Sequence, residues 1–116
     1  MIKIAVDAMG GDNAPGEIVK GAVDAVTERN DITVCLTGQK DAIEKELSKF
    51  TYKKEQIEIV DAPEVIETGE PPVNAIRKKK NSSLVVGLNL VKNGEADGFV
   101  SAGSSGAVLV GGQVIV

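Results

Sequence analysis

Four consecutive cations followed by two hydroxyl side chains form the segment of this sequence best suited to binding an anion. The cations occupy residues 77–80, and Ser82 and Ser83 follow at a predicted helix start. Arginine offers a planar fork of donors, lysine a mobile point charge, and Ser83 a backbone N–H together with its hydroxyl. We interpret the segment as a phosphate receptor. The alternatives are a solvated basic face with an ordinary serine cap, and a nucleic-acid patch.

A glycine turn is the second segment that could do chemistry. Gly10 and Gly11, followed by Asp12 and Asn13, connect a predicted strand to a predicted helix. Paired glycines let backbone N–H groups approach an anion closely, and the helix start adds a favourable dipole. The spacing matches neither of the common nucleotide-binding glycine motifs. A tight turn capped by Asp12 or Asn13 is therefore an equal alternative.

The third candidate is a run of small residues after the last predicted strand. Gly103 and Gly106 enclose Ser104 and Ser105. Such a run offers concave backbone donors to an oxyanion, although it also suits a close strand–helix crossing. The sequence contains no histidine, so a Ser–His dyad within these residues is excluded.

Composition excludes several further kinds of site. Without histidine, and with Cys35 as the single cysteine, the chain has no disulfide framework and no thiolate metal cluster. We expect neither a metal nor a cofactor, and we expect Cys35 to fill an apolar strand. The net charge of −4 argues against a nucleic-acid partner. The apolar run at the start is too short for a secretory signal, which favours a reducing, cytoplasmic setting.

The elements that position these loops alternate between strand and helix. We expect strands at 2–7, 32–36, 57–60 and 98–101, and helices near 15–26, 41–50, 72–80, 83–92 and from 103 onward. This alternation predicts an α/β fold with a mostly parallel sheet and helices on both faces, a three-layer α/β/α arrangement. Parallel strands bring the loops that follow them to one edge, where ligands usually bind. The pattern does not predict strand order.

The apolar run at 107–116 has no partner within the sequence. It is interrupted only by Gln113 and lacks a capping glycine or polar tail. A helix this apolar needs cover on most sides. We therefore interpret residues 1–116 as the amino-terminal, truncated part of one α/β domain.

Three segments together resemble the PlsX family of phosphate acyltransferases. They are residues 4–15, residues 72–83, and residues 96–103 with Gly106 and Ala107, in the family's order and spacing. Arg77, Lys79, Ser82 and Ser83 stand at the family's typical positions. The chain departs from the family where it has Ser104-Ser105 in place of Asn-Thr, and Leu84 in place of methionine. The resemblance implies a fold similar to that of isopropylmalate dehydrogenase and phosphotransacetylase.

The resemblance also implies an enzyme of phospholipid and fatty acid metabolism. Such a transferase moves a fatty acyl group from acyl carrier protein to inorganic phosphate and forms acyl-phosphate. It implies a cytoplasmic homodimer that can associate peripherally with membranes, and we expect the fragment alone to be inactive. A phosphate acetyl- or butyryltransferase acting on coenzyme A thioesters, and a non-catalytic interaction module, are the alternatives. The expected phosphate- and substrate-binding residues are Gly10, Gly11, Asp12, Arg77, Lys79, Ser82, Ser83, Gly103, Ser104, Ser105 and Gly106; no catalytic residue is identified.

Overall fold

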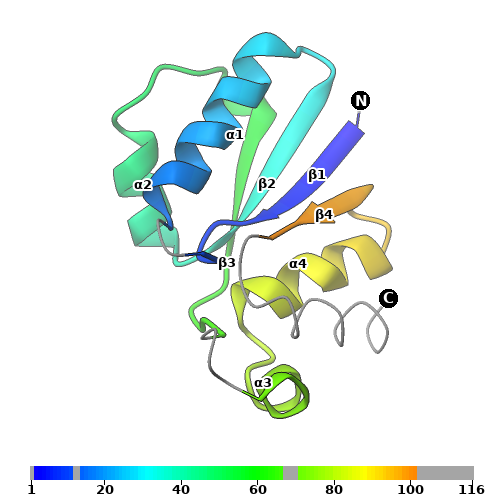
Figure 1. The fold of residues 1–116 in the computed structure, drawn as a ribbon. Helices are drawn as coiled ribbons and strands as arrows, with labels where there is room; N and C mark the ends of the chain where they lie inside the picture. The colour runs from blue at the N-terminus through cyan, green and yellow to red at the C-terminus, as the bar shows by residue number, and fades with distance from the viewer. Residues whose placement is uncertain (1, 12–13, 67–70, 102–116) are drawn as a thin grey trace.

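The structure is a computed structural model that describes residues 2–11, 14–66 and 71–101, without the side chains of Pro72 and Val73. Strands and helices alternate in these ranges (Figure 1). The strands are β1 (Ile2–Asp7), β2 (Ile32–Gly38), β3 (Ile57–Asp61) and β4 (Gly98–Val100). The α-helices are α1 (Gly16–Glu28), α2 (Lys40–Leu47), α3 (Pro72–Lys78) and α4 (Ser83–Lys92), and a 3₁₀ turn, Lys54–Gln56, precedes β3.

The four described strands form one parallel sheet in the order β3-β2-β1-β4. The central pair is the longest, with Ile2 opposite Ile32 and Asp7 opposite Thr37. The chain moves outward from β1 through β2 to β3, and then crosses back to place β4 on the other side of β1. All carboxyl ends therefore share one edge, as the α/β prediction required.

Helices cover both faces of the sheet, which confirms the three-layer α/β/α class (Figure 1). On one face, α1 and α2 pack against β2 and β3. Val19, Val23 and Val26 of α1 recur at helical spacing and lie against Val34 and Leu36 of β2. Alternate strand residues point to the other face, where buried polar side chains such as Asp7, Thr33 and Thr37 lie beside Ala5 and Cys35.

On the opposite face, α4 and α3 form a second core. Leu84, Val85 and Leu88 of α4 pack with Ile76 of α3 and with Phe99 of β4. Gly87 makes this crossing close, because a Cβ at that position would lie 2.3 Å from a ring carbon of Phe99. Gly94, with a φ of 76°, follows the helix in the left-handed conformation that favours glycine.

Most element boundaries agree with the sequence-based expectation. The predicted helix at 41–50 is shorter, since α2 ends at Leu47 and Phe50 closes a turn by donating its N–H to the Leu47 carbonyl. The predicted helix at 72–80 ends at Lys78, because Lys79 leaves the helical conformation. The predicted helix from Gly103 lies outside the described residues, as does the run at 107–116.

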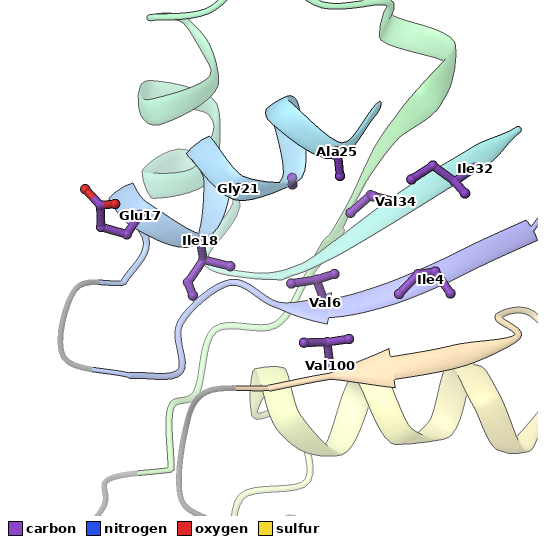
Figure 2. A pocket seen from close by; sticks show the side chains of 10 residues that line it. Ile4, Val6, Glu17, Ile18, Gly21, Ala25, Ile32, Val34 and Val100 are labelled. Atoms are coloured by element: carbon purple, nitrogen blue, oxygen red, sulfur yellow. The ribbon is translucent and has the colours of Figure 1, made fainter. Parts of the chain in front are cut away.

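An apolar groove remains open between α1 and the edge of the sheet (Figure 2). It has a volume of about 380 Å³ and is lined chiefly by aliphatic side chains, with Glu17 at its rim. Ile4 and Val6 of β1, Ile18 of α1 and Val100 of β4 face it (Figure 2). Val100 keeps 57% of its surface exposed. Among the described residues, α1 lies mainly over β2 and leaves this face of β1 and β4 uncovered.

Replacing Gly87 with alanine tests the close crossing of α4 and β4. The new methyl group has to displace the Phe99 ring, so Gly87→Ala should lower the free energy of unfolding by about 1 to 3 kcal/mol in urea titrations. Gly21→Ala is the matched control, because no atom lies within 4 Å of its Cβ position in α1. That control should be stabilised by up to about 1 kcal/mol. Equal stability of the two variants would contradict the packing described here.

Candidate functional site

Buried polar side chains gather at the carboxyl edge of the sheet. In the described ranges six polar or charged side chains are buried, and four of these lie at the carboxyl ends of strands or at the start of α4. Buried polar groups are costly unless they are hydrogen-bonded, so such a cluster needs mutual partners. The four are Asp7, Thr37, Ser82 and Ser83; the other two, Thr33 and Gln56, lie toward the amino end.

Asp7 is the last residue of β1, and its carboxylate is almost fully buried, with the residue 3% exposed. The backbone N–H of Met9 donates to its Oδ1 at 3.0 Å. The hydroxyl of Ser101, the residue after β4, donates to its Oδ2 at 2.8 Å. One side chain therefore joins the ends of two strands that lie far apart in the sequence.

Thr37 connects the sheet to the start of α4. Its buried hydroxyl donates to the carbonyl oxygen of Ser83 at 2.8 Å, and the carbonyl oxygen of Val6 lies 3.3 Å away. The carbonyl of Thr37 in turn accepts the N–H of Ala8 at 2.9 Å. The turn that leads to Gly10 and the first turn of α4 therefore meet at the same edge.

Ser82 and Ser83 have structural partners in the described residues. Ser82 is the N-cap of α4, and its hydroxyl accepts the N–H of Val85 at 3.2 Å, which confirms the serine cap that the sequence predicted. The N–H of Ser83 donates to the carbonyl of Glu64 at 3.0 Å. This N–H, expected from the sequence to be available to phosphate, is therefore engaged within the protein.

The loop after β3 braces the cationic segment. Glu64 forms an isolated parallel bridge with Ser82, and its carboxylate accepts the N–H of Asn81 at 3.1 Å. The ammonium of Lys79 donates to the carbonyl of Val65 at 2.7 Å. These contacts hold the connection between α3 and α4 against residues 64–65, and they direct the Lys79 side chain to that loop.

Arg77 and Lys78 lie in the last turn of α3 with exposed side chains, and Lys80, which follows the helix, is also exposed. Ala75 and Ile76 are buried and anchor α3 in the second core. Figure 1 shows α3 beyond the carboxyl ends of the strands, on the same side as the start of α4. The cations thus lie at the edge that also carries the turn at Gly10.

The glycine segments are described in part. Gly10 is buried, and Gly11 has a φ of 96°, a conformation that favours glycine. Asp12 lies outside the described residues, as do Gly103, Ser104, Ser105 and Gly106. The structure therefore brings Gly10, Gly11, Ser82 and Ser83 to one edge with α3.

Thr37 is the edge residue that the sequence did not single out, whereas Asp7 and Ser101 lie within the segments at 4–15 and 96–103 but were not among the expected binding residues. The available signal for Asp7 was an acidic residue at the end of an apolar strand. Thr37 had no comparable signal, because threonine is common in strands. Its importance appears only when its hydroxyl is seen to contact a helix 46 residues further along the chain.

The described residues contain neither a candidate metal site nor a helix that could span a membrane. No group of three acidic, cysteine or histidine side chains in these ranges is arranged to hold a metal ion. None of the helices in the same ranges has the length and apolar character required to cross a bilayer.

Cys35 lies in the middle of β2 and is buried, as the sequence predicted. Its Sγ lies 3.4 Å from Oε2 of Glu58 on the neighbouring strand. Burial, and then the hydrogen bond and negative charge of Glu58, raise the pKa of the Cys35 thiol to about 11. The thiol is therefore protonated near neutral pH and is a poor nucleophile.

Comparison with known proteins identifies relatives along the whole chain. A family model described as "Fatty acid synthesis protein" matches residues 2–116. A protein of Clostridium botulinum named "Phosphate acyltransferase" is 54% identical over 115 residues, which are 99% of this chain and 34% of the relative. Proteins of the same name from Clostridium acetobutylicum and Clostridioides difficile are 51% and 50% identical over 97% and 99% of this chain. The chain spans about a third of the length of these curated relatives.

The raised pKa of Cys35 has a measurable consequence for alkylation. With a pKa of about 11 in place of the ordinary 9.0, the thiolate fraction at pH 8 is about 100-fold lower than in the unfolded chain. Iodoacetamide labelling of the native protein should be slower by at least that factor than labelling in concentrated urea. Because the folded state holds this proton more tightly, stability should decline as pH rises from about 9 to 11, and Cys35→Ala should remove that part of the decline. Rapid labelling of the native protein at pH 8 would contradict this account.

Proposed function

Because this chain belongs to the family of fatty acid synthesis proteins, we propose that it forms part of a phosphate acyltransferase. In this proposal the full-length enzyme transfers a fatty acyl group from acyl carrier protein to inorganic phosphate, and its acyl-phosphate product feeds phospholipid synthesis. The names of the curated relatives support acyl transfer to phosphate. The choice of acyl carrier protein over coenzyme A as donor rests on the resemblance of the sequence motifs.

One observation carries the proposal furthest. The bonds from Ala8 to Thr37 and from Thr37 to Ser83 hold the start of α4 at the edge where the turn at Gly10 begins. Open α/β sheets bind ligands at this edge. The segment with Arg77 and its neighbouring lysines ends beside this edge (Figure 1). Positive charge and the backbone of the glycine turn are therefore available on the same side of the sheet.

The proposed reaction needs no covalent acyl-enzyme. An oxygen of hydrogen phosphate attacks the thioester carbonyl carbon, the carbon–sulfur bond breaks, and the leaving thiolate takes the proton that phosphate carried. The products are acyl-phosphate and the free thiol of the carrier. Arg77 would orient the attacking phosphate, and proximity would supply much of the acceleration. Backbone donors near Gly10 and Gly11, and those at 103–106, would stabilise the tetrahedral oxyanion.

The proposed setting follows the same resemblance. The full-length enzyme would act in the cytoplasm as a homodimer, receive its donor from a soluble carrier protein, and associate with the membrane only peripherally. The exposed cations of α3 provide a surface suited to a partner whose contacting surface is acidic.

A substrate panel tests the function. The full-length protein should release acyl-phosphate from long-chain acyl carrier protein in a phosphate-dependent reaction, detected by trapping with hydroxylamine. It should act poorly on acetyl- or butyryl-coenzyme A. Preference for the short coenzyme A thioesters would instead support a phosphate acetyl- or butyryltransferase. Absence of turnover with every donor would leave a non-catalytic module as the interpretation.

Arg77→Ala tests the phosphate assignment. Loss of a charge-assisted hydrogen bond should raise the KM for phosphate about 10- to 100-fold and leave the KM for the acyl donor nearly unchanged. Arg29→Ala is the matched control, since Arg29 is also an exposed arginine but lies just before β2 at the opposite edge, paired with Asp31. A phosphate KM equal to that of the unmodified protein would show that Arg77 does not bind phosphate.

A further inference from the structure

Asp7 differs from every other buried polar group at the carboxyl edge because it is ionisable. It is the one buried acidic or basic side chain in the ranges that the structure describes. Burying a carboxylate is costly unless donors surround it. A threonine or asparagine could close a turn at lower cost, so the position calls for an explanation beyond filling space.

The carboxylate continues the connection between β1 and β4 past the end of the strand ladder. Val6 and Val100 are the last paired residues of these two strands. Beyond them the link passes to side chains, because the Ser101 hydroxyl donates to Asp7 at 2.8 Å. In the described residues, this hydrogen bond extends the contact between β1 and β4 one residue past their last backbone pair.

The other carboxylate oxygen shapes the turn after β1. It accepts the Met9 N–H at 3.0 Å, one residue before Gly10. An ionised carboxylate only accepts hydrogen bonds, so both donors must point toward it. One carboxylate therefore holds two positions in the chain: Met9, just before the turn at Gly10–Gly11, and Ser101, the residue after β4.

The position of Asp7 relative to α4 indicates how it acts. Asp7 lies opposite Thr37 in the parallel register, on the face where the Thr37 hydroxyl contacts the first turn of α4. The start of α4 is the region proposed above to lie near phosphate. A carboxylate in direct contact with that anion would repel it. Asp7 is therefore better placed to act through the backbone that it holds than by touching substrate.

We propose that Asp7 is a positioning residue for acyl transfer: with Ser101 and the Met9 N–H as its partners, it fixes the two strand ends between which the reaction occurs. The proposal rests on the proposed function. It concerns transition-state geometry and not phosphate affinity, so it predicts a change in kcat where Arg77 predicts a change in KM.

The test compares Asp7→Ala, Ser101→Ala and the double variant in the full-length enzyme, each corrected for its folded fraction. Small misplacements of reacting groups are costly, so Asp7→Ala should lower kcat about 10- to 100-fold, with the KM for phosphate changed by less than about threefold. Ser101→Ala should have a smaller effect. The double variant should lose less than the sum of the two single effects, because both changes remove one shared bond.

Gln56→Ala is the matched structural control. Gln56 is equally buried, and its amide donates to the carbonyls of Arg29 and Ile32, but it lies at the amino end of the sheet. It should lower the melting temperature without changing kcat. Asp7→Asn keeps one acceptor oxygen, so it should retain more activity than Asp7→Ala.

The outcomes separate the two proposals. If the unmodified enzyme is active and Ser101→Ala and the Asp7 variants keep its kcat, the positioning role is wrong and the function stands. Additive effects of the two alanine changes would also overturn it. If Asp7→Ala does not fold, Asp7→Asn and Ser101→Ala decide the matter by the same kcat and KM measurements. An unmodified enzyme without phosphate-dependent acyl transfer would overturn the proposed function, and this inference with it.

Discussion

The hydrogen bond from the Thr37 hydroxyl to the Ser83 carbonyl is the contact on which the carboxyl edge depends. It joins β2 to the first turn of α4 where both partners are buried. A buried carbonyl without a donor would be destabilising, so the start of α4 is held to the end of β2. Since α3 and its cations directly precede α4, this bond acts with the contacts of residues 64–65 to hold positive charge at the same edge.

The two apolar cores stabilise the fold away from the polar edge, which allows polar side chains to be buried there. The α1 face is closed by aliphatic residues of α1, α2 and β2, and the α4 face by Leu84, Leu88 and Phe99. Buried polar side chains lie at the ends of β1 and β2, on the α4 face. There Asp7 and Thr37 replace aliphatic side chains, and their hydrogen bonds substitute for packing. The chain thereby concentrates its buried polar groups at the edge where α/β folds bind ligands.

The sequence was sufficient to predict the alternation of elements and the class of fold, because apolar periodicity and glycine or proline boundaries are local signals. Strand order was not predictable. Nothing in the residues of β4 indicates that it pairs with β1, a contact that joins Ile4 to Gly98 across the whole chain. A serine cap at residue 82 or 83 was one of the readings that the sequence left open, whereas the bond between Lys79 and Val65 was not predicted. A lysine that contacts a backbone carbonyl leaves no trace in the sequence.

The candidate site, like the fold, was predicted where the signal was local and missed where it depended on distant contacts. Glycine and cationic segments stand out as runs of residue types, and the structure places the described ones at one edge. Asp7 and Ser101 lie within the segments at 4–15 and 96–103 but were not expected to bind substrate, and Thr37 was not singled out, because their hydrogen-bond partners come from distant parts of the chain. Single buried polar residues at strand ends were the weakest signal in the sequence and the most informative one in the structure.

The groove beside β4 has a mechanical consequence. Val100 forms part of its wall, and the next residue along the chain gives its hydroxyl to Asp7. A group bound in the groove would therefore contact Val100, one residue before the serine that links the ends of β1 and β4. The apolar groove on the α1 side and the polar contact at the carboxyl edge are thus joined by two adjacent residues, Val100 and Ser101.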